Sequence, residues 1–227
     1  MDSFIDLQAD DGTSFRAYVT EPTVNPIGGI VLLQEIFGVN EHIRAVADRY
    51  AAEGYLVVAP ATFHRVQPAV ELGYTEENMT TGFGYKTAVE ALPAPGVMAD
   101  IQAAIEHAAQ GGKVGILGFC WGGLLAWRSA CSLSGLSAAV TYYGGGMTVG
   151  NELMRQPQVP VLAHFGDQDH WIPLDTIEAF RQAHPEVEVQ VYAANHGFNC
   201  DQRGSYNKEA ALLARQRTLA FFKQHLA

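Results

Sequence analysis

The run that most restricts the fold is "GGIVLLQE", residues 28–35, which is apolar at every position before it ends in two polar residues. A strand that is apolar throughout is buried on both faces, and such strands occur in parallel sheets covered by helices. Similar runs recur at "YLVVAP", "KVGILGF" and "VPVLAHFG", with helical patterns between them. This alternation predicts an α/β protein with a mostly parallel central sheet and helices on both faces.

The remaining elements follow from local patterns. Two N-terminal segments, "FIDLQ" and "SFRAYVT", flank the turn-rich residues 9–13 and predict an antiparallel hairpin. Residues 61–95 mix aromatic, Gly, Thr and Pro residues without a period, so we expect a loop and a short helix over the sheet. Helices are expected at 41–53 and 96–112, from about Trp121, and at 175–183 and 207–225, and further strands at 136–143 and 187–194.

Length and charge exclude several classes of protein. The 227 residues fit one domain, 1–227, without a linker. The net charge is −10 and the basic residues are scattered, so neither nucleic acid nor an anionic membrane is an expected partner. No apolar run approaches the roughly 18 residues that cross a bilayer, and the acidic N-terminus "MDSFIDLQADDG" lacks a signal core. Three cysteines without C-x-x-C spacing indicate neither a disulfide framework nor a zinc knuckle. We expect a cytoplasmic monomer.

The segment "GFCWGG" places Cys120 between Gly118 and Gly122, directly between a predicted strand and a predicted helix. This G-x-C-x-G pattern is typical of a nucleophile elbow, in which glycines relieve crowding around a strained turn. The helix N-terminus favours a thiolate, and the Trp121 N–H would supply half of an oxyanion hole. The alternative is a small, inert thiol between packing glycines.

Other strand ends carry polar residues that could serve the same site. Asp169 follows one apolar strand, with Asp167 as the alternative carboxylate, and His196 follows the last strand. The chain order Cys120, Asp169, His196 is the order expected on an α/β-hydrolase. A metal site is the competing interpretation, but it leaves the elbow unexplained, so no metal is expected; its ligands would be His164, Asp167, Asp169 and His170.

Glu35 ends the buried run at 28–35. A carboxylate in that position is costly unless it faces solvent or a functional site. The position alone leaves both possibilities open, a solvated loop residue or a member of the site.

With these features, the chain resembles the dienelactone hydrolase family, the carboxymethylenebutenolidases of the α/β-hydrolase fold. The resemblance extends along the chain through "QEIFGVN", "GYLVVAP", "GKVGILGFCWGG", "GDQDHWIP", "HGF" and "RTLAFF". It implies a cofactor-free hydrolase of small esters or lactones with a Cys120, Asp169 and His196 triad. It also implies that Glu35 lies close to the thiol and helps to take its proton, and that the N–H groups of Ile36 and Trp121 form the oxyanion hole.

Two departures from the family pattern concern the substrate. Thr81 stands where relatives carry a carboxylate-binding arginine, and Ala61 stands where many have an aspartate. The physiological substrate therefore stays open, and a broad carboxylesterase, a thioesterase and a silent ligand-binding homologue are the alternatives. The candidate substrate-binding residues are Phe37, Arg65, Tyr85, Lys86, Phe198 and Arg203.

Overall fold

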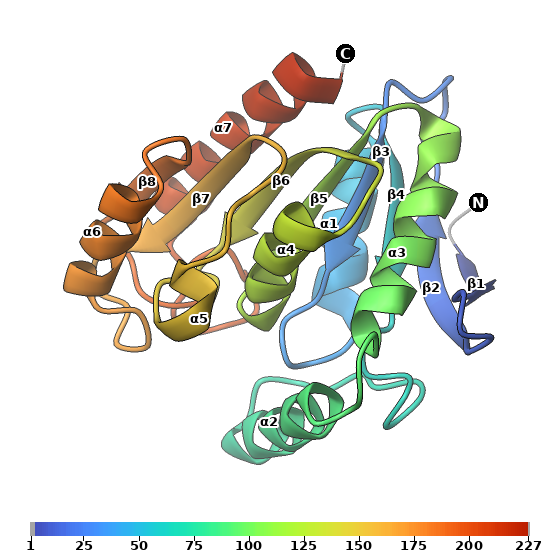
Figure 1. Ribbon diagram of the computed structural model, residues 1–227, viewed down its shortest axis with the longest axis horizontal. Coiled ribbons are helices and arrows are strands. Elements are labelled where there is room, and N and C mark those ends of the chain that lie inside the picture. Colours follow the sequence, from blue (N-terminus) through green and yellow to red (C-terminus); the bar gives the residue numbers. More distant parts are fainter. Residues whose placement is uncertain (1–2, 227) are drawn as a thin grey trace.

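The computed structural model describes residues 3–226 and contains an eight-stranded sheet in the order β1-β2-β4-β3-β5-β6-β7-β8 (Figure 1). The strands β3 to β8 are parallel to one another. In the N-terminal hairpin, β1 and β2 are antiparallel, and β2 also pairs antiparallel with β4. The predicted α/β fold class is confirmed. The strands are β1 Ser3–Gln8, β2 Ser14–Thr20, β3 Gly29–Leu33, β4 Leu56–Pro60, β5 Val114–Phe119, β6 Leu136–Tyr142, β7 Val161–Gly166 and β8 Glu188–Tyr192.

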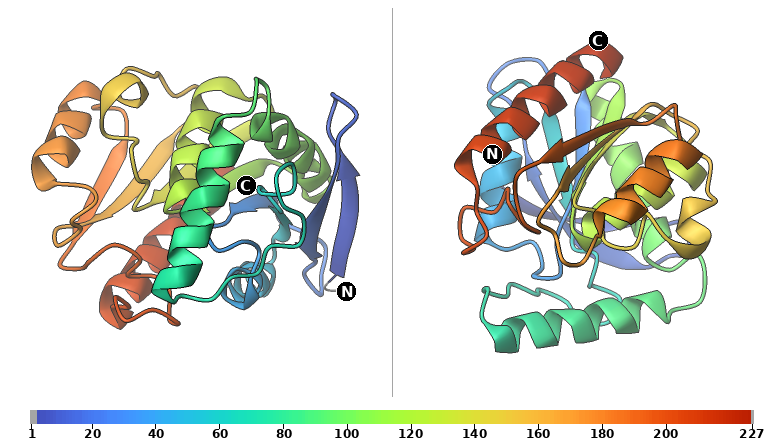
Figure 2. Two further views of the ribbon diagram at one scale, coloured as in Figure 1. Left: turned by 90° about the horizontal axis from the view of Figure 1, so that it is seen from below. Right: turned by 90° about the vertical axis from the view of Figure 1, so that its left-hand side faces the viewer.

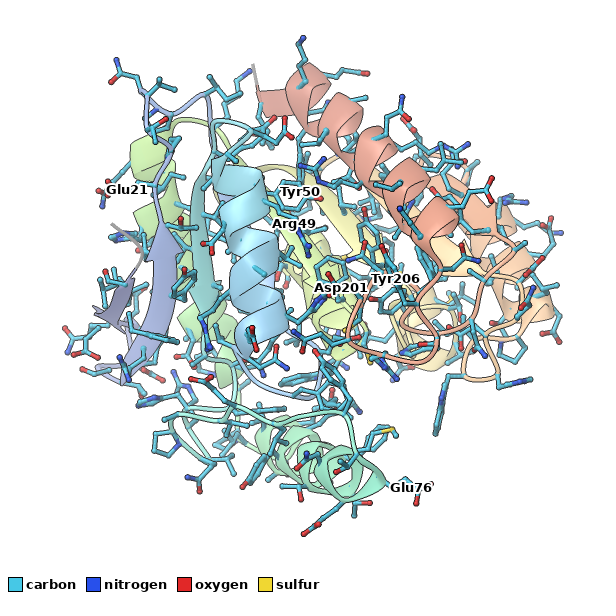
Figure 3. The ribbon with its side chains drawn as sticks, turned by 180° about the vertical axis from the view of Figure 1, so that it is seen from behind. Glu21, Arg49, Tyr50, Glu76, Asp201 and Tyr206 are labelled. Carbon is cyan, nitrogen blue, oxygen red and sulfur yellow. The ribbon has the colours of Figure 1, made fainter. Side chains whose placement is uncertain are left out.

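Helices cover both faces of the sheet. Helices α1 and α7 lie on the face seen in Figure 3, and α3 and α4 lie on the face seen in Figure 1. The α6 helix packs beside α4, where the Trp127 and Phe180 rings are 5.2 Å apart. The helices are α1 Glu41–Ala51, α2 Glu76–Glu90, α3 Val97–Ala108, α4 Trp121–Ser132, α5 Gly150–Leu153, α6 Leu174–Ala183 and α7 Lys208–Leu226, with a 3-10 turn at Ala109–Gly111.

The strands that were apolar in sequence form the centre of the core. Every residue of β3, β4, β5 and β7 is buried. Because these strands are parallel, their carboxyl ends meet at one edge of the sheet, which is where the α/β-hydrolase site is expected. None of the helices within residues 3–226 has the length and apolar character needed to cross a membrane.

The segment 61–95 differs from the expectation. Instead of a short helix it contains α2, which has 15 residues and begins at a Thr75 cap that accepts a hydrogen bond from the Asn78 N–H. Only Gly82 and Val89 of this helix are buried, so it has no apolar stripe that a search for helical spacing could detect. The helix lies apart from the layered sheet and helices, as the right-hand view of Figure 2 shows.

Candidate active site

The turn between β5 and α4 holds Cys120 in a strained conformation, with φ +53° and ψ −117°. Positive φ is uncommon for a residue with a side chain, and it persists only where the surroundings enforce it. Here the Cys120 N–H donates to the Tyr142 carbonyl at 3.0 Å, which ties the turn to β6. A Cβ at Gly118 would collide with the Gly122 carbonyl, and one at Gly122 would collide with the backbone of β3 and Gln34. The glycines are therefore required for the turn.

Two backbone N–H groups lie next to this turn. Ile36 follows the end of β3, Trp121 begins α4, and both line the same cavity as Cys120. Among the described residues 3–226, neither N–H donates to a protein acceptor. The Trp121 indole is held from both sides, because its Nε1–H donates to Glu90 Oε1 at 2.9 Å and its ring stacks on Phe63 at 5.1 Å. Both N–H groups are available to an oxygen of a bound molecule.

His196 and Asp169 form a buried pair. The Nδ1 atom of His196 lies 2.7 Å from Asp169 Oδ2, and the second oxygen of Asp169 accepts the Trp171 N–H at 2.8 Å. The alternative carboxylate, Asp167, is exposed and makes no such contact. Of the two candidate acids, Asp169 is therefore the one in position to orient the imidazole.

The charge state of His196 depends on its neighbours. Burial by itself lowers the pKa of His196, but the negative charge of Cys120 and the hydrogen bond to Asp169 outweigh burial and raise the pKa to about 10. The Tyr143 ring lies 5.0 Å from the imidazole. The protonated imidazole is therefore the favoured form whenever the Cys120 sulfur beside it is ionised.

Glu35 is 2% exposed, so the solvated-loop interpretation of this residue is wrong. Its Oε1 lies 3.2 Å from Arg203 Nη1, and Oε2 has no partner among the described protein groups. Burial lowers the pKa of Arg203, but the charge of Glu35 outweighs this effect and raises it. The arginine also lies over the Phe37 ring at 5.6 Å. Glu35 is therefore a buried, charge-compensated carboxylate beside the site.

Cys120, His196 and Arg203 border one cavity of about 330 Å³, together with Ile36 and Trp121. Its wall is mainly apolar and aromatic, and among residues 3–226 it contains one lysine, Lys86, and one arginine, Arg203. The lining residues are Ile36, Phe37, Met79, Phe83, Lys86, Cys120, Trp121, Gly145, Gly146, Trp171, His196 and Arg203.

Several residues predicted for substrate binding lie elsewhere. Arg65 binds Asp100 through two nitrogens, at 2.7 and 2.9 Å, and Asp11 at 2.7 Å, so its charge is used inside the fold. Tyr85 packs against Phe63 at 5.7 Å. The prediction that Arg65 and Tyr85 contact the substrate is therefore corrected, because neither residue lines the cavity.

Two further positions also fall outside the wall. Phe198 is fully buried against Tyr143 and Tyr192. Thr81 directs its hydroxyl to the Glu77 carbonyl of its own helix and does not line the cavity, so it does not occupy a substrate-clamp position.

The metal interpretation also lacks a suitable arrangement. Both ring nitrogens of the buried His164 have partners, with Tyr192 Oη at 2.8 Å and Thr218 Oγ1 at 3.0 Å. Within residues 3–226, no three His, Cys, Asp or Glu side chains are placed to hold a metal ion.

Sequence reasoning predicted Lys86 but missed other wall residues, namely Met79, Phe83, Gly145, Gly146 and Trp171. Met79, Phe83 and Lys86 are spaced by four and three residues, so they share one face of α2. Trp171, Gly145 and Gly146 come from loops after β7 and β6. The helical spacing of Met79, Phe83 and Lys86 was the sequence signal for this wall, but it covers only these three residues of α2 and is too short to mark an apolar stripe.

A mostly parallel sheet with a strained elbow and a His–Asp pair at its strand ends defines the α/β-hydrolase class. The model of the dienelactone hydrolase family matches residues 15–226, and the chain belongs to this family. It is a hydrolase of carboxylic esters or lactones.

Similar proteins support this assignment. A Pseudomonas putida carboxymethylenebutenolidase is 34% identical over 96% of this chain and 94% of its own. A Synechocystis protein provisionally given the same name is 35% identical over 92% of this chain and 91% of its own. A Klebsiella pneumoniae crystal structure, provisionally named a dienelactone hydrolase, superimposes with a TM-score of 0.85 at 34% identity, over 99% and 98% of the two chains.

Proposed function

We propose that the chain hydrolyses small esters or lactones through Cys120, with His196 as the base and Asp169 as the residue that orients it. The observation that carries this proposal is the shared cavity, which brings Cys120 and His196 together while Asp169 holds the imidazole at 2.7 Å. The strained elbow and the free N–H groups of Ile36 and Trp121 support it. The inert-thiol alternative gives no reason for this convergence.

The reaction follows from these positions. The thiol proton of Cys120 passes to His196, directly or by way of Glu35, and the sulfur attacks the carbonyl carbon. The C=O electron pair moves to the oxygen, and the N–H groups of Ile36 and Trp121 stabilise that oxyanion. As the intermediate collapses, the C–O bond breaks and the alkoxide takes a proton from His196. Water then gives a proton to His196 and attacks the thioester, which releases the acid and the Cys120 sulfur. In a lactone the alkoxide stays attached to the acyl group.

Glu35 has a supporting role in this proposal. Its Oε2 is buried without a protein partner, so it can accept the thiol proton when Cys120 is not yet turned toward His196. A carboxylate near a thiol opposes ionisation, so the idle enzyme would be protected from oxidation. Arg203 Nη1 lies 3.2 Å from the other oxygen, Oε1, and compensates the charge of this carboxylate.

The cavity favours small, largely apolar substrates. Aromatic and aliphatic side chains form most of its wall, and Lys86 and Arg203 can attract an acidic group. A panel of dienelactone, p-nitrophenyl esters and acyl thioesters would rank the lactonase, carboxylesterase and thioesterase assignments by kcat/KM.

The nucleophile is tested with Cys120→Ala, Cys120→Ser and the control Cys131→Ala, because Cys131 is another partly exposed thiol. We expect Cys120→Ala to abolish ester hydrolysis and to prevent a covalent adduct with an ester-mimicking inhibitor in mass spectrometry. Cys120→Ser should lose most turnover, because an alcohol ionises far less readily than a thiol. Cys131→Ala should keep both ester hydrolysis and formation of the covalent adduct. Full hydrolysis by Cys120→Ala would refute the assignment and favour a different nucleophile.

A further inference from the structure

Two exposed aromatic side chains meet at the cavity. Phe83 on α2 is 39% exposed and Trp171 on the loop after β7 is 68% exposed. Their ring centroids are 5.9 Å apart at an angle of 41°, and both rings line the cavity that contains Cys120 and His196. Large apolar side chains that stay exposed beside a functional cavity indicate a binding surface.

Both rings are fixed relative to the reacting groups. The Trp171 N–H donates to the same Asp169 that holds His196, at 2.8 Å. On the other side, Gly82 places α2 against the Ile36 carbonyl, and Glu90 at the end of α2 accepts the Trp121 indole N–H. Trp171 is therefore fixed next to Asp169 and His196, and Phe83 is fixed next to the backbone of Ile36 and Trp121.

We propose that Phe83 and Trp171 form an aromatic clamp that selects esters that carry an aromatic ring. This inference rests on the proposed function, since it places that ring beside the ester attacked by Cys120. The two rings are tilted rather than stacked, so each keeps part of its face for a third ring. A saturated ring of similar size is bulkier and lacks the π face, so it fits this clamp less well.

The clamp is a specificity device rather than a packing contact, and the two roles predict different kinetics. Loss of a packing contact would disturb α2 and lower the turnover of every substrate. Loss of a substrate contact raises KM for the aromatic substrate and leaves kcat in place.

The test compares methyl 3-phenylpropanoate with methyl 3-cyclohexylpropanoate, whose reacting carbonyls are separated from the ring by the same two methylene groups. We expect the wild type to prefer the phenyl ester. Phe83→Leu and Trp171→Leu should each lower the phenyl-to-cyclohexyl ratio of kcat/KM by about threefold to tenfold through KM, and Trp171→Phe should keep most of the preference. Tyr206→Leu is the matched control, because Tyr206 is 38% exposed but lies beside α1 and α7 on the other face (Figure 3). An unchanged ratio in both leucine variants, or an equal loss of kcat for both esters, would overturn the clamp.

A binding experiment separates the clamp from the nucleophile assignment. The alcohol 3-phenylpropanol contains no ester, so its binding does not depend on Cys120. Trp171 is exposed and Trp127 is buried away from the cavity, but the buried Trp121 also lines the cavity, so the part of the quenching that is lost in Trp171→Phe reports on the clamp. We expect quenching by 3-phenylpropanol in the wild type and in Cys120→Ala, with part of it lost in Trp171→Phe and weaker binding in Phe83→Leu. Absence of quenching in the wild type would overturn the clamp even if Cys120 proves to be the nucleophile.

Discussion

The Nη1 atom of Arg203 lies 3.2 Å from Oε1 of Glu35, and this contact joins the end of β3 to the loop that follows His196. Glu35 is almost completely buried, and the side chain of Arg203 is 17% exposed. An isolated charge at this depth is strongly unfavourable, so the charge of each partner offsets the cost of burying the other. The Glu35–Arg203 pair therefore stabilises the fold in addition to its proposed role in the reaction.

Removing only the cation should leave the Glu35 charge uncompensated. We expect Arg203→Met to lower the free energy of unfolding by about 3–5 kcal/mol, and Glu35→Gln in the same chain to restore much of that loss. Denaturant unfolding of the two single variants and the double variant measures the coupling. The control is Arg181→Met, whose pair with Glu178 is exposed at 3.2 Å, with an expected cost below about 1 kcal/mol. Additive losses at Glu35 and Arg203 would contradict the coupling.

The placement of α2 gives a second prediction, because two glycines of this helix have different surroundings. A Cβ at Gly82 would collide with the Ile36 carbonyl, whereas nothing lies within 4 Å of a Cβ at Gly84. We expect Gly82→Ala to shift α2 against Ile36 and lower kcat/KM by about tenfold or more, since misplacement by 1 Å can cost about a hundredfold. Gly84→Ala should keep full activity and stabilise the helix by about 0.5–1 kcal/mol. Equal activities of the two variants would show that α2 does not position the site.

The central sheet and the elbow could be predicted because their signals are local. Uninterrupted apolar runs mark β3 and β5, and the glycines around Cys120 mark the strained turn. The positions of Asp169 and His196 follow because parallel strands end at the same edge of a sheet. These features required no knowledge of side-chain partners.

The cavity wall was less predictable because it depends on tertiary contacts. Arg65 had the charge expected of a substrate clamp, but Asp100 and Asp11 bind it, and no sequence pattern announced those partners. Trp171 lies beside the predicted acid in sequence, yet its contact with Phe83 depends on where α2 lies. The α2 helix itself buries too few residues to produce an apolar period.

The raised pKa of His196 leads to a pH prediction. Its charged form is favoured, so the imidazole should stay protonated from its ordinary value of 6.5 up to about 10 and lose its proton above that. We expect the kcat/KM profile to fall at high pH with an apparent pKa near 10, because the leaving alkoxide then lacks its proton donor. Histidine NMR should show the same titration, and Cys120→Ala should move it to lower pH, because burial remains while the thiolate charge is lost. A titration near 6.5 in the wild type would contradict the charge pairing.

The final prediction concerns acidic substrates and the two cations in the cavity wall. The charge of Arg203 is already met by Glu35 at 3.2 Å. Lys86 is only loosely paired with Glu90 at 3.8 Å, and that carboxylate also accepts the Trp121 indole N–H. Lys86 is therefore the cation that is freer to bind a carboxylate.

We compare monomethyl succinate with the neutral dimethyl ester, so that one added charge is the main difference. We expect Lys86→Gln to lower the acidic-to-neutral ratio of kcat/KM by about tenfold, because a charged hydrogen bond contributes about 1.5–3 kcal/mol and each 1.4 kcal/mol is about a factor of ten. Lys223→Gln on α7 is the charge-matched control and should leave the ratio unchanged. Thr81→Arg should also have little effect, because Thr81 does not line the cavity. If Thr81→Arg raises the ratio while Lys86→Gln does not change it, α2 must present the opposite face to the substrate.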